Sequence, residues 1–291
     1  MGGGSYTASD WSKLKQSRGI DNNVSYRELF RSSHMNDLYN PRLIGTRESR
    51  DNDEHPNSTP IAIGVDVTGS MGYLSEEIIK NGLNELMKKL YASDVIKDPQ
   101  LMFAACGDFC DEAPLQVTQF ESDIRIATQL LDLWIEQGGY GNGGEDYQLF
   151  WYFLDKHTDT DSMRKRNKKG YAFTIGDEPC HATAYADTLQ RVFGDPSTDI
   201  STAEIAEACS KKYNLFHINI THSYGENTVI PGKTIQISQE EVKFIPEIII
   251  TAICKCEGVD PTNILGDLDP NVQRILKMAF RNVQFGEVIT I

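Results

Sequence analysis

Three side chains that carry oxygen ligands, Asp66, Thr68 and Ser70, stand at alternate positions at the end of the apolar run 61–67. A run that is apolar at nearly every position is typical of a strand buried on both faces of a parallel sheet. A turn leaving such a strand can aim residues i, i+2 and i+4 at one point if the residues between are small, and Gly69 supplies that freedom. Two hydroxyls and a carboxylate suit a hard divalent cation such as Mg²⁺.

More polar side chains are expected at the same edge of the sheet. Asp108 follows the predicted strand 101–106, and Asp177 follows the predicted strand 171–175. In open α/β sheets, ligands bind beyond the carboxyl ends of the strands, so these residues should converge. The candidate metal ligands are Asp66, Thr68, Ser70, Asn142, Glu145, Asp146 and Asp177, with Asp108 and Gly69 as candidates for the surrounding shell.

The segment Asp66-Val67-Thr68-Gly69-Ser70 resembles the D-x-[ST]-x-S signature of the von Willebrand factor A domain family. The resemblance implies a doubly wound, mostly parallel sheet with a metal-ion-dependent adhesion site for Mg²⁺ or Mn²⁺ at its carboxyl edge. It also implies that Thr68 and Ser70 ligate the ion through hydroxyls and Asp66 through its carboxylate, partly through water. Asp177 is similar to the final acidic residue of the family.

The sequence departs from the family in the loop 138–146, which has no Thr where the family usually has one. Asn142, Glu145 or Asp146 must substitute, and the sequence does not decide which. The Gly-rich loop and the segment 176–181 resemble most the A domains of intracellular microbial and alpha-kinase-linked proteins. A direct carboxylate ligand from the loop would neutralise the cation better, which would make the site more structural than adhesive.

Alternating strand and helix patterns predict an α/β fold with a doubly wound sheet flanked by helices. We expect an extended polar N-terminal arm over 1–59 with one short helix at 26–33, an A domain over 60–240, and a helical extension over 241–291 packed on it. The predicted strands are 61–67, 101–106, 115–120, 171–175, 215–220 and 234–237. The predicted helices are 73–91, 123–136, 147–154, 201–212, 242–253 and 270–280, with capping boxes at Ser201/Glu204 and Ser238/Glu241.

Composition narrows the class of protein. The 291 residues are 40% hydrophobic and carry 28 basic against 42 acidic side chains, a net charge of −14 with a pI near 4.9. This balance argues against a nucleic-acid-binding role, and no apolar stretch approaches the roughly 20 residues of a membrane span. The N-terminus lacks the pattern of a signal peptide, and the six cysteines are irregularly spaced. We expect a soluble, cytoplasmic protein.

These observations favour a non-catalytic, metal-dependent protein-interaction module that acts as an adaptor in an intracellular complex. Its partner would offer a carboxylate or another oxygen donor to the cation, and the resemblance places AAA-type ATPases among the partners to consider. Two alternatives stay open. One is a self-associating assembly subunit of a microbial or phage particle, whose arm wraps a neighbour while the metal only rigidifies the scaffold. The other is a metal-assisted hydrolase.

Two further patterns have less consequence. Cys180 and His181 lie close to Asp177 in the sequence, as in a thiol-nucleophile site, but neighbouring residues rarely face one another, so we interpret the segment as a loop rim. The basic run 164–169 is interpreted as a solvated loop rather than an anion site.

Overall fold

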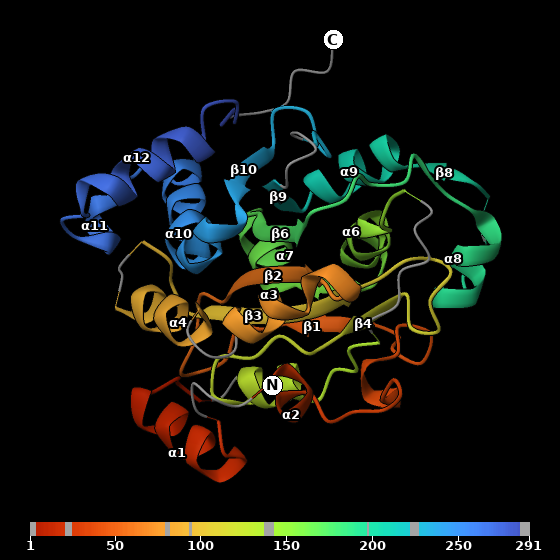
Figure 1. Ribbon diagram of the computed structural model, residues 1–291, viewed down its shortest axis with the longest axis horizontal. Helices are drawn as coiled ribbons and strands as arrows, with labels where there is room; N and C mark the ends of the chain where they lie inside the picture. Colours follow the sequence, from red (N-terminus) through yellow and green to blue (C-terminus); the bar gives the residue numbers. More distant parts are fainter. Residues whose placement is uncertain are drawn as a thin grey trace.

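The computed structural model describes residues 4–20, 25–78, 82–92, 95–136, 143–196, 198–221 and 227–285. Its centre is a six-stranded sheet in the order β10-β9-β6-β2-β3-β4, in which only the edge strand β4 runs antiparallel (Figure 1). The predicted doubly wound α/β fold is confirmed. The strands are β2 (Thr59–Asp66), β3 (Pro99–Cys106), β4 (Leu115–Val117), β6 (Gly170–Gly176), β9 (Tyr213–Thr221) and β10 (Thr234–Ser238).

Helices cover both faces of this sheet. Side chains alternate along each strand, so Ile61 and Ile63 of β2 face one apolar cluster while Ala62 faces the other. The first cluster takes in α4 (Leu83–Tyr91), α5 (Arg125–Leu131) and α10 (Ile245–Cys256); the second takes in α6 (Tyr147–Lys156), α8 (Ala186–Phe193) and α9 (Thr202–Ser210) (Figure 1). Burial on both faces explains why the strands are nearly continuous apolar runs.

The register of the central strands brings the predicted ligands to one edge. Asp66, the last residue of β2, pairs with Cys106 at the end of β3, and Val65 pairs with Ile175 near the end of β6. The residues that follow these strands therefore leave the sheet side by side. Asp108 and Asp177 are among them, as predicted from the order of strands.

The N-terminal arm is more structured than the predicted extended segment. It forms α1 (Ala8–Arg18), α2 (Tyr26–Leu29), the 3-10 turn η1 (Asp37–Tyr39) and β1 (Arg47–Ser49), which pairs in parallel with β5 (Thr158–Thr160). Trp11 and Phe30 are buried in the first apolar cluster. The sequence predicts no helix at α1 because Trp11 and the partly buried Leu14 are not enough to form an apolar stripe, and the rest of α1 is mostly polar.

The basic run is also corrected. Part of it forms α7 (Asp161–Arg166), not a loop. Arg166 and Lys165 both pair with Asp51 of the arm, and Lys165 also pairs with Asp161. The side chains of Lys165 and Arg166 therefore pair with carboxylates of the same chain. Their ion pairs with Asp51 hold the end of the arm on the domain.

The C-terminal residues pack on the sheet as η4 (Gln239–Phe244), α10, α11 (Thr262–Leu265) and α12 (Pro270–Ala279). Both predicted capping boxes are present, and Pro246 lies in the first turn of α10, where it costs no hydrogen bond. The predicted helix 73–91 is observed as α3 (Gly72–Glu77) and α4 on either side of residues outside the description. The remaining short elements are η2 (Gly69–Met71), β7 (Thr183–Ala184) and β8 (Ile200–Ser201).

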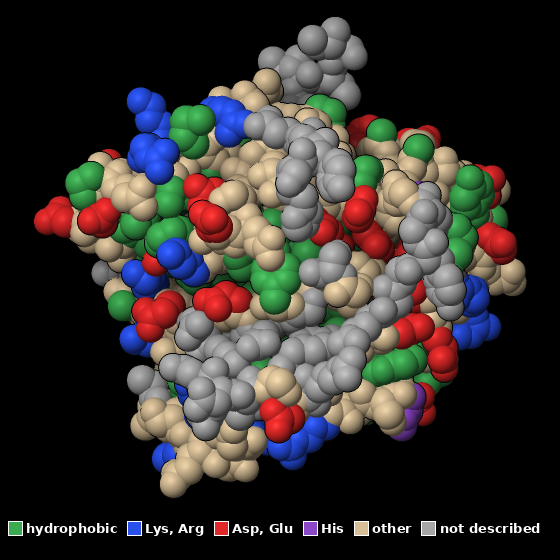
Figure 2. Space-filling view, in the orientation of Figure 1, with side chains coloured by type: hydrophobic (Ala, Val, Ile, Leu, Met, Phe, Trp, Pro, Cys, Tyr) green, Lys and Arg blue, Asp and Glu red, His purple; other side chains and the backbone are tan. Residues whose placement is uncertain are grey.

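The acidic charge is dispersed on the face shown in Figure 2, where Asp and Glu side chains form separate groups with Lys and Arg between them. The described residues on this face therefore form no continuous acidic patch. Among the helices that the structure describes, none is both long and apolar enough to cross a bilayer.

Candidate metal centre

Asp66 is the centre of the predicted site and is fully buried. Its Oδ1 accepts hydrogen bonds from the backbone N–H of Thr68 at 2.9 Å and from the Thr68 hydroxyl at 2.7 Å. The hydroxyl of Tyr147, at the start of α6, donates to the other oxygen, Oδ2, at 3.1 Å. The turn after β2 thus brings the i and i+2 side chains together, as their spacing predicts.

Glu145 and Asp177 add carboxylates to the same place, and both are buried. We call Asp66, Thr68, Glu145 and Asp177 the Asp66 cluster. Within the described residues, the Oε2 atom of Glu145 and the hydroxyl of Tyr73 are buried and have no hydrogen-bond partner. Buried polar atoms without partners are rare in folded proteins, and they commonly mark a bound ion or water.

The pKa shifts in the Asp66 cluster also favour a bound cation. Burial raises the pKa of Asp66 to about 7, and the charge of Asp177 adds to the rise while hydrogen bonds from Thr68 oppose it. Burial, followed by the charges of Asp66 and Asp108, raises the pKa of Glu145 to about 10. Crowded, buried carboxylates can ionise together only if a positive charge joins them. A divalent cation would supply it.

The loop that carries Glu145 and Asp146 is held by the segment after β6. Glu145 forms a parallel bridge with Cys180: its N–H donates to the carbonyl of Pro179 at 2.8 Å, and its carbonyl accepts from the N–H of His181 at 3.1 Å. Neighbouring side chains in extended backbone point to opposite sides. Glu145 accordingly belongs to the Asp66 cluster, and Asp146 belongs to a second group.

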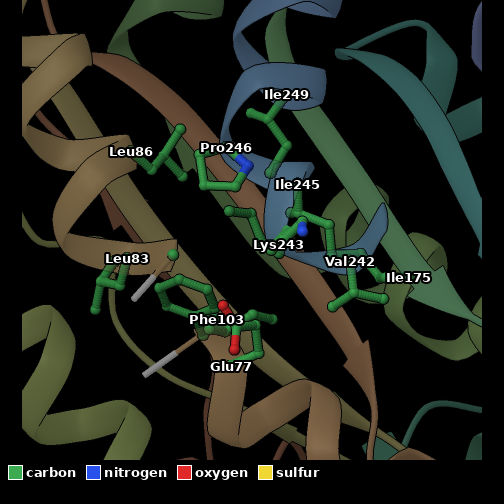
Figure 3. Close-up of a pocket in the computed structure, with 13 residues that line it drawn as sticks. Glu77, Leu83, Leu86, Phe103, Ile175, Val242, Lys243, Ile245, Pro246 and Ile249 are labelled. Carbon is green, nitrogen blue, oxygen red and sulfur yellow. The ribbon is translucent and has the colours of Figure 1, made fainter. Parts of the chain in front are cut away.

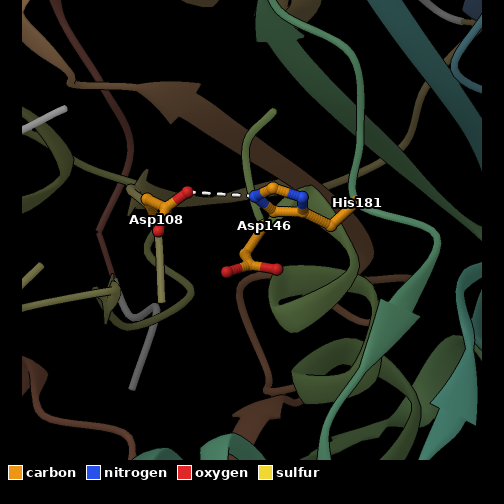
Figure 4. A group of neighbouring side chains, drawn as sticks. All are labelled: Asp108, Asp146 and His181. Carbon is orange, nitrogen blue, oxygen red and sulfur yellow. Dashed lines mark hydrogen bonds and ion pairs between the residues drawn. The ribbon is translucent and has the colours of Figure 1, made fainter. Parts of the chain in front are cut away.

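That second group consists of Asp108, Asp146 and His181, which we call the Asp108 cluster. One ligand atom from each lies within 4.8 Å of the others, and the arrangement could hold a metal ion (Figure 4). His181 Nε2 lies 3.0 Å from Asp108 Oδ2. Burial raises the pKa of Asp146 to about 6, although the charge of His181 opposes the rise.

The predicted ligands are therefore divided between two clusters. Asp66, Thr68 and Asp177 lie with Glu145, whereas Asp146 lies with Asp108, which the sequence analysis considered only for a surrounding shell. Gly69 is exposed at the start of η2. Asn142 lies outside the described residues, and the description does not include the side chain of Ser70.

Sequence analysis missed His181 and Tyr147 as members of the site. Cys180-His181 was noticed, but His181 meets Asp108 across 73 residues of chain and through two loops, so no local spacing encodes the contact. Tyr147 was predicted only as the start of the helix 147–154, and its first position in α6 turns its hydroxyl toward β2. A Tyr directly after the acidic pair was the available signal.

A separate recess lies between α4 and the η4–α10 segment. Leu83 and Leu86 line one side, Ile245 and Ile249 the other, and Phe103 of the sheet lines the floor (Figure 3). It is almost wholly apolar, so it contributes no ligands to either cluster.

Comparisons with known proteins do not assign a family. No protein-family model matches the sequence, and no curated protein matches it. Among solved structures, the chain is similar to the pilus adhesin SpaC of Lactobacillus rhamnosus GG in an open conformation, with 10% sequence identity and a TM-score of 0.37. The match covers 80% of this chain and 31% of the adhesin chain. A similarity this low supports no statement about function.

Proposed function

We propose that the protein is a metal-dependent protein-interaction module whose Asp66 cluster binds Mg²⁺ or Mn²⁺. Asp66, Glu145 and Asp177 would supply carboxylates, and Thr68 a hydroxyl. The observation that carries the proposal is the buried, unpartnered Oε2 of Glu145 among carboxyl groups with raised pKa values. The resemblance of residues 66–70 to the von Willebrand factor A signature supports the same ion and the same class of function.

Glu145 determines whether the cation attracts a partner's oxygen donor or only stabilises the fold. Three ionised carboxylates would more than neutralise a divalent cation and weaken its attraction for a partner's acid. Mg²⁺ takes six oxygen ligands, however, so these three carboxylates and the Thr68 hydroxyl leave positions that water or a partner's oxygen donor can fill. We therefore propose a cytoplasmic adaptor whose partner, an AAA-type ATPase among the candidates, contributes that donor.

The assembly-subunit alternative would require a different use of the arm. Arg166 pairs with Asp51, Ser49 hydrogen-bonds to Gln100 at 2.8 Å, and β1 pairs with β5 of the same chain. An arm that wrapped a neighbour would have to exchange these contacts. Self-association that persists after metal removal would favour that alternative over ours.

The test measures metal binding and partner capture together. Thermal unfolding is recorded with Mg²⁺, Mn²⁺ or EDTA for the unmodified chain, for Asp66→Asn, and for the control Asp187→Asn on α8. We expect Mg²⁺ at one hundred times its Kd to add about 2.7 kcal/mol of stability, which Asp66→Asn abolishes and the control retains. Capture of a partner from lysate of the source should need Mg²⁺ and Asp66. Equal capture by the folded Asp66→Asn variant would refute the interaction role.

A further inference from the structure

We infer that Asp108, Asp146 and His181 form a second metal centre, separate from the Asp66 cluster, which binds a first-row transition cation such as Zn²⁺. The chemistry of the donors distinguishes the two places. The Asp66 cluster offers only oxygen, which suits Mg²⁺, whereas an imidazole nitrogen beside two carboxylates favours Zn²⁺ and its neighbours in the first row. The inference does not depend on the proposed function of the Asp66 cluster.

The spacing of the donor atoms fits one shared cation. Two ligands each about 2.1 Å from an ion, at angles of about 90° to 109°, lie roughly 3.0 to 3.4 Å apart. His181 Nε2 and Asp108 Oδ2 are 3.0 Å apart, and the Asp146 oxygen completes the triangle within 4.8 Å. A small inward movement of Asp146 would bring all three donors to an ion.

Groups behind the ligands orient them. The N–H of Cys110 donates to Asp108 Oδ1 at 2.8 Å, which leaves Oδ2 directed at His181. The N–H of Phe109 donates to Asp146 Oδ2 at 2.6 Å, and the Gln148 amide donates to Oδ1. Hydrogen bonds of this kind to ligating carboxylates are a regular feature of metal sites.

The His181 ring forms the boundary between the buried acids and solvent. Asp108 and Asp146 are buried, whereas the His181 side chain is 22% exposed. Its ring meets the edge of Phe109, and Gly144 lies directly beneath it, where a Cβ atom would come within 3.0 Å of the ring. His181 also lines a recess with Pro179. Solvent therefore reaches the His181 ring, whereas the two carboxyl groups behind it are buried.

His181 and Asp108 can also pair without a metal, since His181 Nε2 already lies within hydrogen-bond distance of Asp108 Oδ2. The chain contains a matched case of simple pairing: His157 Nε2 lies 2.9 Å from Asp195 Oδ2, and the third partner there is the hydroxyl of Tyr152 instead of a second carboxylate. This pair offers one carboxylate fewer than the Asp108 cluster. It is the control for metal binding by a lone His–Asp contact.

The experiment titrates the full chain with Co²⁺, which absorbs visible light when bound, in excess Mg²⁺ and then displaces Co²⁺ with Zn²⁺. Because Co²⁺ can also replace Mg²⁺ among oxygen ligands, the titration is repeated on Asp66→Asn. We expect one Zn²⁺-displaceable equivalent in both proteins. His181→Gln and Asp108→Asn should each weaken it at least tenfold, and His157→Gln should leave it unchanged.

Absence of this equivalent, or unchanged affinity in both His181→Gln and Asp108→Asn, would overturn the inference. If those variants do not fold, a second experiment on the unmodified chain tests the inference. Zn²⁺ should then protect His181 from diethyl pyrocarbonate while His34 on the surface continues to react, as read by peptide mass spectrometry. Equal modification of His181 with and without Zn²⁺ would overturn the inference as well.

Discussion

The Asp66 and Asp108 clusters each take one side chain from the adjacent residues Glu145 and Asp146, but the two clusters differ in their donor atoms. Glu145 faces Asp66 and Asp146 faces Asp108, and one step further along, Tyr147 donates to Asp66 while Gln148 donates to Asp146. The first cluster is an oxygen-only group in which the Oε2 of Glu145 has no partner in the described structure. The second cluster also contains the imidazole of His181. One short segment therefore supplies side chains to two neighbouring clusters that differ in their donor atoms.

The largest expected effect is a pH dependence of folding stability that comes mainly from the Asp66 cluster. The folded-state pKa values of Asp66 (about 7) and Glu145 (about 10) lie above the unfolded values near 4, so the folded protein retains protons that the unfolded chain has released. Stability without metal should therefore fall as pH rises from about 5 to 7, by about 1 kcal/mol per pH unit for each carboxyl. Urea unfolding in EDTA at several pH values measures it.

Two substitutions sharpen the pH comparison. Glu145→Gln should remove much of the slope, whereas Asp146→Asn should remove less, because the pKa of Asp146 is raised only to about 6. Saturating Mg²⁺ should flatten the profile of the unmodified chain, since a bound cation favours the ionised carboxylates. A flat profile in EDTA would show that the carboxyls of the Asp66 cluster are not held protonated in the folded protein.

A matched pair of glycine substitutions should give the next largest effect. A methyl group at Gly176 would overlap the Tyr147 hydroxyl and come within 3.0 Å of Asp66 Oδ2, so Gly176→Ala should cost about 1–3 kcal/mol and abolish Mg²⁺ stabilisation. Gly144→Ala would press on the His181 ring at 3.0 Å and on the backbone carbonyl of Pro179 at 3.1 Å, and both contacts are looser than the overlap at Gly176. It should cost less stability and weaken Zn²⁺ binding selectively. Equal losses in both variants, measured by denaturant unfolding, would contradict the separation of the clusters.

The smallest effects come from the supporting side chains on α6. Tyr147→Phe removes one hydrogen bond to Asp66 and should cost about 1 kcal/mol, with a severalfold loss of Mg²⁺ affinity. Gln148→Met removes the amide that donates to Asp146 and should affect Co²⁺ or Zn²⁺ affinity instead. Calorimetric titrations of both variants with Mg²⁺ and Zn²⁺ test whether each substitution affects the affinity for one ion only. If each variant bound both ions more weakly to the same extent, the two clusters would not be separate sites.

Most of the sheet was predictable because its strands are buried on both faces and read as apolar runs, as for Ile61–Val67 and Tyr171–Ile175. The pairing of Asp66 with Thr68 was predictable from their spacing. The placement of Glu145 beside Asp66 and of Asp146 beside Asp108 was not, because it depends on the bridge between Glu145 and Cys180, a contact between two loops. Local pattern indicates which segments are strands, whereas the ligand set depends on how distant loops meet.

The helices α8 and α1 were also not predicted from the sequence. α8 was missed although Leu189, Val192 and Phe193 are buried along it. α1 was missed although Thr7 caps its start and Gly19 ends it in the left-handed region. Terminal signals without an apolar stripe were insufficient to identify α1, and its stability comes from docking Trp11 on the core.

The pairing of β1 with β5 sets an order on how the chain is completed during synthesis. Arg47 pairs with Thr158 and Asp51 pairs with Arg166, so both contacts must wait until the chain has been made as far as β5 and α7. Trp11 and Phe30 lie in the same apolar cluster as α4, whose residues are made well before β5. The arm can therefore dock its apolar side chains early, whereas the pairing of β1 with β5 closes late, because contacts between residues far apart in the sequence form slowly.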